Sequence, residues 1–194
     1  MTRLVLASAS ASRARMLKAA GVEFTTDPAD IDEDAAKSLS RDAADIAQLL
    51  ADQKALAVSA RHAGALILGA DQVLLFDGEL VSKCPDMTAA KALLLRLSGK
   101  PHELISAATL ARAGRVEWRG LDRARLWVRP LSESFIDEYL TAEGPGLLSG
   151  VGCYRMEGRG AQLFERVEGD HFTILGLPLL GLLAALREQG MLRS

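Results

Sequence analysis

The stretch of sequence that decides the fold is Leu4-Val-Leu-Ala7-Ser8-Ala-Ser10-Ala-Ser12-Arg13. Leu4 to Ala7 is a short apolar run of the kind that a buried central strand gives. A serine-rich turn follows at once, and a helical pattern then continues as far as Gly21. The chain therefore begins as strand, turn and helix, which predicts an α/β protein.

The alternation of strand and helix continues along the chain. Asp42 can cap a second helix, and residues 65–68 form a second buried strand. Asp77-Gly78 predicts a two-residue hairpin turn. Further elements are expected as a helix over 88–97, a long hairpin over 102–129, a helix after Ser132, short strands within 153–167 and a C-terminal helix with Pro178 in its first turn. No repeat or long linker marks a boundary, so we expect a single domain over residues 1–194.

Bulk composition predicts a self-sufficient globular protein. The chain has 49% hydrophobic and 25% charged residues and a formal net charge of −2, which argues against disorder and against a general polyanion-binding surface. Cys84 and Cys153 have no metal-ligand spacing and are expected as reduced thiols in a cytoplasmic protein. Residues 174–186 are apolar but too short and too interrupted to span a membrane. We therefore expect neither a membrane nor a nucleic acid as partner.

The serine-rich turn can form a phosphate cradle. Small hydroxyl residues leave backbone amides exposed at the start of a helix, where the helix dipole favours an anion. Ser8 and Ser10 can add hydroxyl donors, and Arg13 can hold phosphate oxygens with two parallel hydrogen bonds. The alternative is an ordinary helix N-cap with surface arginines.

Carboxylates suggest a site for a hard cation. An apolar run that predicts a strand leads into Asp71, which puts this residue at the C-terminal end of the strand, where ligands bind in α/β sheets. A second group lies in the Asp30-Ile-Asp32-Glu33-Asp34 segment. Oxygen ligands without clustered histidines suit Mg²⁺ or Mn²⁺ rather than zinc. The alternatives are a turn residue for Asp71 and a solvated acidic loop for the segment.

Two lysines are candidates for contact with an anion. Lys54 lies on the same predicted helical face as Ile46 and Leu50, so it need not point into bulk water. Its alternative is a lysine whose stem covers apolar surface while its ammonium is solvated. Lys83 follows the predicted hairpin and precedes Cys84-Pro85, which could place its ammonium over the same cleft.

Six blocks, in order and spanning nearly the whole chain, resemble the Maf family. They are Leu4-Val-Leu-Ala-Ser-Ala-Ser10…Arg13, Asp30-Ile-Asp-Glu33, Leu50-Ala-Asp-Gln-Lys54-Ala55, Gly69-Ala-Asp-Gln-Val73, Leu97-Ser-Gly99…His102 and Gly176-Leu-Pro178. The resemblance implies a two-lobed α/β fold with an elongated mixed sheet, flanking helices and a nucleotide cleft between the lobes. It also implies hydrolysis of a nucleoside triphosphate to monophosphate and pyrophosphate.

The resemblance further implies roles for individual residues. It places Ser8, Ser10 and Arg13 on the triphosphate, Lys54 and Lys83 on phosphate oxygens, Glu33 beside a Mg²⁺ or Mn²⁺ ion, and Asp71 as the residue that activates water or binds the metal. Two departures from the family pattern are Ser12, which replaces a second arginine, and Cys84, an extra residue between Lys83 and Pro85. A homodimer is what the family suggests. A non-catalytic regulator of cell division is the rival interpretation from another class.

The segment Cys153-Tyr-Arg-Met-Glu157-Gly158 favours a guanine base. It resembles the Maf subgroup that acts on 7-methyl-GTP more than the dTTP/UTP subgroup, which has Ile-Gln-Gly at residues 156–158. A carboxylate at Glu157 can accept from two guanine N–H groups but would face a carbonyl of uracil or thymine. The alternatives are dTTP/UTP hydrolysis and a surface glutamate. Trp118 and Trp127 could stack on a cationic base, although a core position is expected for both.

Overall fold

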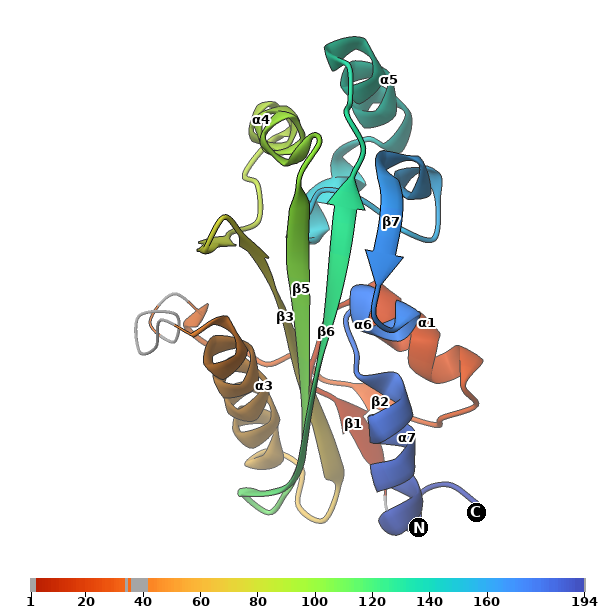
Figure 1. The fold of residues 1–194 in the computed structure, drawn as a ribbon. Coiled ribbons are helices and arrows are strands. Elements are labelled where there is room, and N and C mark those ends of the chain that lie inside the picture. Colours follow the sequence, from red (N-terminus) through yellow and green to blue (C-terminus); the bar gives the residue numbers. More distant parts are fainter. Residues whose placement is uncertain (1–2, 34, 36–41, 194) are drawn as a thin grey trace. The chain divides into compact units, whose positions relative to one another are not determined.

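The computed structural model describes residues 3–33, 35 and 42–193, which form a mixed seven-stranded sheet with flanking helices (Figure 1). The strands are β1 (Leu4–Leu6), β2 (Thr25–Thr26), β3 (Leu66–Phe76), β4 (Glu79–Val81), β5 (Pro101–Arg112), β6 (Arg115–Val128) and β7 (Phe164–Glu168). The helices are α1 (Ala11–Ala19), α3 (Ala43–Ser59), α4 (Met87–Leu97), α5 (Glu133–Glu143), α6 (His171–Ile174) and α7 (Leu179–Glu188), with 3-10 turns η1 (Pro145–Ser149) and η2 (Arg159–Leu163). The predicted α/β class is confirmed.

The chain divides into two compact units. The first comprises Met1–Gln72, Ile105–Asp122 and Asp170–Ser194, and the second comprises Val73–Leu104 and Arg123–Gly169. Hydrogen-bonded neighbours in the sheet follow the order β2-β1-β3-β5-β6-β7, with β4 paired to β3. The long strands β3, β5 and β6 therefore contribute residues to both units.

In the first unit, both faces of the sheet are covered. β1 pairs in parallel with β2 and with β3, and Leu6 is in register with Leu68. Because strand side chains alternate between faces, Leu66 and Leu68 pack with α1 and α7, whereas Ile67 packs with α3. Burial on both faces explains why β1 and the first part of β3 read as continuous apolar runs.

Strand β3 is one continuous element, whereas the sequence predicted a strand with Asp71 at its C-terminal end. β1 ends at Leu6, and its last partner on β3 is Leu68. β3 nevertheless continues to Phe76 because its outer part pairs with β4 through the predicted Asp77-Gly78 hairpin, where both residues have positive φ. Asp71 therefore lies inside a strand rather than at its end, and that part of the prediction is wrong.

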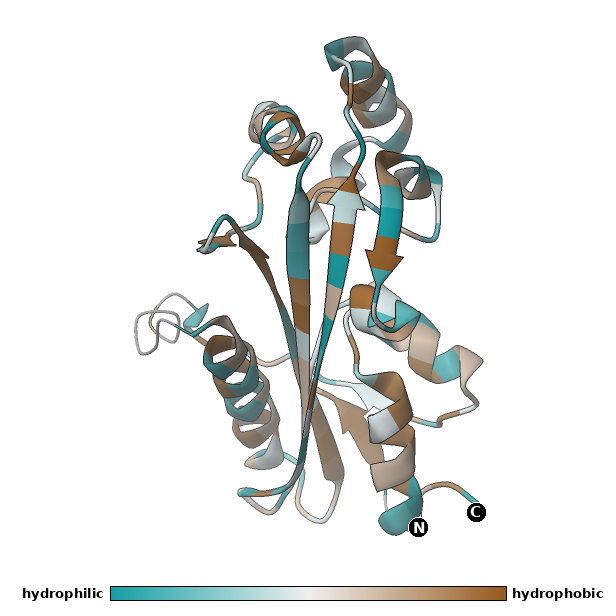
Figure 2. Cartoon of the chain, in the orientation of Figure 1, coloured by the Kyte–Doolittle hydropathy of each residue, from teal (hydrophilic) through white to brown (hydrophobic). Residues whose placement is uncertain are grey.

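The second unit combines the outer parts of β3, β5 and β6 with β4, β7 and the helices α4 and α5. The two helices pack against each other and against η1. Hydrophobic and hydrophilic bands alternate along β6 and β7, which pair antiparallel (Figure 2). The sequence predicted several short strands within residues 153–167. The structure has one strand there, β7, which begins at Phe164, because a turn closed by Gly158 and then η2 occupy the residues before it.

The C-terminal helix also differs from its prediction. Pro178 is the N-cap of α7 rather than part of its first turn, and α6 is a separate short helix. The left-handed backbone of Gly176, at φ 107°, separates the two helices. Across the residues with described placement, no helix is both long enough and apolar enough to cross a bilayer.

Helix α3 lies unusually close to β3 at Gly69. A Cβ atom built at this glycine would lie 2.2 Å from the Ala51 carbonyl oxygen and 2.5 Å from the Ala55 amide nitrogen. Backbone atoms of a helix cannot move aside as a flexible side chain can. The glycine therefore permits a helix–strand contact that any side chain would prevent.

We expect Gly69→Ala to lower the free energy of unfolding by about 2 kcal/mol or more, because the new methyl group must push α3 away from β3. Urea denaturation of both proteins measures the difference. Gly150→Ala is the matched control, since a Cβ atom at that position would have its nearest neighbour 3.9 Å away and the φ of Gly150 is not positive. Equal stability of the Gly69→Ala variant and the native protein would contradict the close contact.

Candidate functional site

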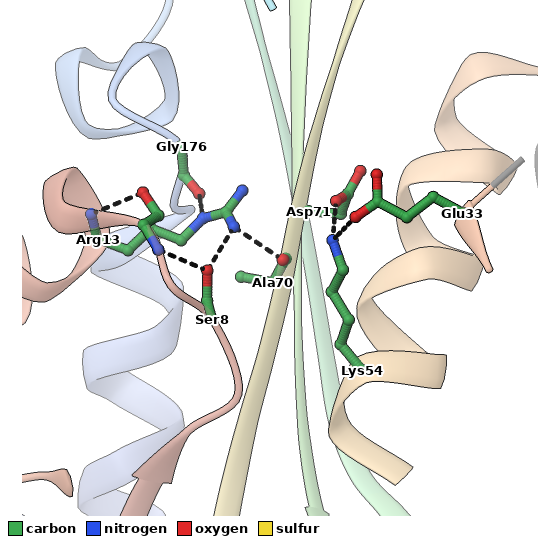
Figure 3. Close-up of polar contacts among 8 residues, drawn as sticks. Ser8, Arg13, Glu33, Lys54, Ala70, Asp71 and Gly176 are labelled. Carbon is green, nitrogen blue, oxygen red and sulfur yellow. Dashed lines mark hydrogen bonds and ion pairs between the residues drawn. The ribbon is translucent and has the colours of Figure 1, made fainter. Parts of the chain in front are cut away.

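Two groups of polar side chains lie on either side of β3 in the first unit (Figure 3). One group gathers around Arg13 and includes Ser8 and the Gly176 carbonyl. The other gathers around Lys54 and includes Asp71 and Glu33. Six of the residues predicted for the site therefore belong to this unit: Ser8, Ser10, Arg13, Glu33, Lys54 and Asp71.

Arg13 is buried and ties three segments of the chain together. Its Nε donates to the Gly176 carbonyl at 2.9 Å, and its Nη1 donates to the Ala70 carbonyl at 2.9 Å and to Ser8 Oγ at 3.0 Å. Burial lowers the pKa of the guanidinium, and the negative charges of Asp71 and Glu33 oppose that shift. The third guanidinium nitrogen, Nη2, has no hydrogen-bond partner among the described residues.

The two serines serve the turn between β1 and α1. Ser10 is the N-cap of α1, and its Oγ accepts from the Arg13 amide at 3.4 Å. Ser8 Oγ accepts from the Ser10 amide at 3.2 Å as well as from Arg13. The helix-cap alternative is therefore confirmed for Ser10. Capping does not exclude phosphate binding, because a hydroxyl oxygen that accepts can still donate its own hydrogen.

Lys54 is held between two carboxylates. Its Nζ lies 2.6 Å from Asp71 Oδ1 and 2.7 Å from Glu33 Oε1. The lysine lies on the buried face of α3 with Ile46 and Leu50, as the sequence predicted. Its ammonium contacts these two carboxylates, and the contact with phosphate oxygens that the family resemblance implied stays a prediction. Glu33 is the contributor from the acidic segment, in which Asp34 lies outside the described residues.

Asp71 and Gln72 extend to opposite faces of β3. Gln72 Nε2 donates to the carbonyls of Thr173 and Ile174 at 2.9 and 3.1 Å and to Ser106 Oγ at 3.0 Å. This amide satisfies carbonyls at the C-terminal end of α6, next to the Gly176 carbonyl that binds Arg13. No role was predicted for Gln72 from the sequence, and its placement on the opposite face from Asp71 follows only once β3 is seen to continue through both residues.

Two predicted site residues belong to the second unit. Lys83 is exposed in the segment between β4 and α4, where it lines a cavity of about 300 Å³ together with Cys84 and Arg96. Glu157 is exposed in a turn closed by a 3.2 Å hydrogen bond from the Gly158 amide to the Arg155 carbonyl. The roles of Lys83 and Glu157 stay predictions.

Both tryptophans are half-buried and pack against other side chains. Trp118 packs against the apolar core of the first unit. The ring centroid of Trp127 lies 5.1 Å from the Arg125 guanidinium and 4.6 Å from that of Arg166. Three arginines of the hairpin that β5 and β6 form are paired with acidic residues: Arg112 with Glu117, Arg119 with Asp52 and Arg123 with Glu103.

The chain is similar to known proteins over nearly its whole length. A family model described as "Maf-like protein" matches residues 3–189. A protein named nucleoside triphosphate pyrophosphatase from Paramagnetospirillum magneticum is 49% identical, over 97% of this chain and 99% of the relative. A protein named 7-methyl-GTP pyrophosphatase from Brucella abortus is 47% identical, over 96% of each chain. A solved structure of a HAM1 protein from Coxiella burnetii has a TM-score of 0.44 and 16% identity, over 66% of this chain and 73% of the other.

We expect Lys54→Met to lower the free energy of unfolding by about 3 kcal/mol, because it leaves two carboxylates facing each other without a counter-charge. Adding Asp71→Asn to that variant should recover part of the loss, since it removes one of the two charges. Chemical denaturation of the four proteins of this cycle measures both effects.

Lys91→Met is the matched control. Lys91 pairs with Glu133 and Asp137, both of which are exposed, so its loss should cost at most about 1 kcal/mol. If Lys54→Met is as stable as the native protein, or if adding Asp71→Asn lowers the stability further, Lys54 is not the counter-charge of the two carboxylates.

Proposed function

This chain belongs to the Maf family, and on that premise we propose that it hydrolyses a nucleoside triphosphate to the monophosphate and pyrophosphate, with 7-methyl-GTP or a related modified nucleotide as substrate. The single observation that carries the proposal is the convergence of Asp71 and Glu33 on Lys54. Two carboxylates that meet at one point, one of them buried, are costly to assemble, and a hydrolytic site uses such groups.

The reaction requires water to attack the α-phosphorus while negative charge grows on the pyrophosphate that leaves. Asp71 orients the attacking water and accepts its proton. Arg13 Nη2 and the backbone amides at the start of α1 stabilise the phosphate oxygens. Supporting these roles, Asp71 and Arg13 are both nine-tenths buried, so their charges act where little water weakens them.

The carboxylates also fit a divalent cation. They present hard oxygen donors, and the Lys54 ammonium already occupies a position between them that suits a positive charge. Among the residues with described placement, no three His, Cys, Asp or Glu side chains gather at one point. Asp71 and Glu33 would therefore hold Mg²⁺ or Mn²⁺ together with the substrate's phosphates, whose charge the ion would neutralise.

The substrate preference rests on Glu157. Relatives with the printed name 7-methyl-GTP pyrophosphatase, from Brucella abortus and Mesorhizobium japonicum, are 47% and 46% identical to this chain. Glu157 is exposed at a turn, so its carboxylate is accessible to a base, and the surface-glutamate alternative predicts the same exposure. We also propose that the protein is cytoplasmic and that it forms a homodimer.

Asp71→Asn should reduce pyrophosphate release at least about 100-fold, because the amide cannot accept the proton from water. The assay measures pyrophosphate from a panel of nucleoside triphosphates with Mg²⁺ or Mn²⁺. Asp137→Asn, which removes an exposed carboxylate of α5, should retain native activity. Recovery of the Asp71→Asn variant at high Mn²⁺ would show that Asp71 acts mainly as a metal ligand.

Three outcomes of the same assay would each overturn a part of the proposal. Full activity of Asp71→Asn would remove this residue from the mechanism. Tight nucleotide binding without pyrophosphate release from any nucleotide would favour the non-catalytic regulator. Release from dTTP and UTP alone would favour the other subgroup of the family.

Glu157→Gln should lower kcat/KM for 7-methyl-GTP about tenfold or more and leave UTP hydrolysis unchanged or improved. The amide replaces one acceptor with a donor, so one guanine N–H loses its partner. Glu165→Gln, an exposed change on β7, is the matched control and should leave both values unchanged. An unaltered preference in Glu157→Gln would eliminate the argument for base recognition.

A further inference from the structure

His102 has no part in the mechanism above, although it belongs to a block that carries the family resemblance. The residue lies near the start of β5 in the second unit and is only 2% exposed. Its Nε2 forms a 2.6 Å hydrogen bond with the hydroxyl of Tyr154. Burial lowers the pKa of His102 to about 4, so the ring is neutral near pH 7.

Three aromatic rings pack together at the two ends of the segment 154–164. Tyr154 stands at its beginning and Phe164 at its end, and their ring centroids lie 4.9 Å apart in an edge-to-face arrangement. The His102 ring lies 5.6 Å from Tyr154 and 6.0 Å from Phe164, so it contacts both ends. Gly152 packs beneath the Tyr154 ring, since a Cβ there would come within 2.3 Å of a ring carbon. We call His102, Tyr154 and Phe164 the ring cluster.

The segment between these ends carries Glu157. The hydrogen bond from the Gly158 amide to the Arg155 carbonyl makes Glu157 the third residue of a four-residue turn. The turn is packed tightly, because a Cβ at Gly160 would lie 2.4 Å from the Arg155 carbonyl oxygen and 2.7 Å from its amide nitrogen. Arg155 directly follows Tyr154, so the direction of Glu157 depends on where the ring cluster holds Tyr154.

We propose that His102 is a positioning residue for base selectivity, which acts through its hydrogen bond to Tyr154 by fixing the turn that presents Glu157. The inference rests on the proposed function, because it assigns Glu157 to the base. Without the hydrogen bond, the Tyr154 ring is held by packing alone and the turn samples more orientations. Binding energy that depends on a defined carboxylate direction is then lost, whereas the phosphate contacts of the first unit are untouched.

His102→Phe keeps a ring of similar shape and removes the hydrogen bond, and Tyr154→Phe removes the same bond from its other end. We expect both variants to raise KM for 7-methyl-GTP about fivefold, with kcat within about twofold of native and KM for UTP unchanged. Inhibition by inorganic tripolyphosphate, a probe without a base, should also be unchanged. Adding Glu157→Gln to His102→Phe should give no further loss beyond Glu157→Gln alone, because both changes remove one interaction.

Leu94→Ala is the control for a merely structural effect. Leu94 is a buried residue of α4, and its truncation should lower the thermal midpoint without changing the ratio of kcat/KM between the two nucleotides. The inference is overturned if His102→Phe and Tyr154→Phe retain the native ratio, or if their effect adds fully to that of Glu157→Gln. If His102→Phe does not fold, Tyr154→Phe decides. A native protein that releases no pyrophosphate overturns the proposed function instead.

Discussion

The rest of the site depends on the ion pair between Lys54 and Asp71, which requires α3 to lie directly against β3. A lysine and an aspartate that are both nearly buried must pair, because each alone would carry an unbalanced charge away from water. The pair forms at 2.6 Å because Gly69, two positions before Asp71 on the same face of the strand, has no side chain to hold the helix away. Glu33 then joins the same ammonium and becomes part of the site.

The continuity of β3 distributes the chemistry of the first unit between two faces. Asp71 extends toward α3, and Gln72 extends toward α6, where it binds the carbonyls of Thr173 and Ile174. One residue before Asp71, the Ala70 carbonyl accepts from Arg13 Nη1, and Arg13 Nε donates to the Gly176 carbonyl. A break in the strand at Asp71 would remove this alternation. The backbone of β3 therefore fixes the distance between the Asp71 carboxylate and the carbonyl that binds the Arg13 guanidinium.

In the second unit, different contacts hold the segment that carries Glu157 in place. The segment that carries Glu157 is short and irregular apart from η2, which packs against α5, and it is further held by the ring cluster and by close contacts at Gly152 and Gly160. Gly152 and Gly160 occupy positions where a side chain would collide with Tyr154 or with Arg155. Small residues in this segment are therefore requirements of close packing rather than signs of a loose loop.

The sequence by itself determined the elements whose causes are local. The apolar run at Leu4, the cap at Asp42 and the Asp77-Gly78 turn each follow from a few neighbouring residues, and the structure has all three. Helical spacing also placed Lys54 on a buried face. Tertiary structure alone decided what Lys54 and Arg13 bind, because their partners lie 17 and 163 positions away in sequence. It also decided that β3 continues through Asp71, since strand length depends on partners that a local pattern does not contain.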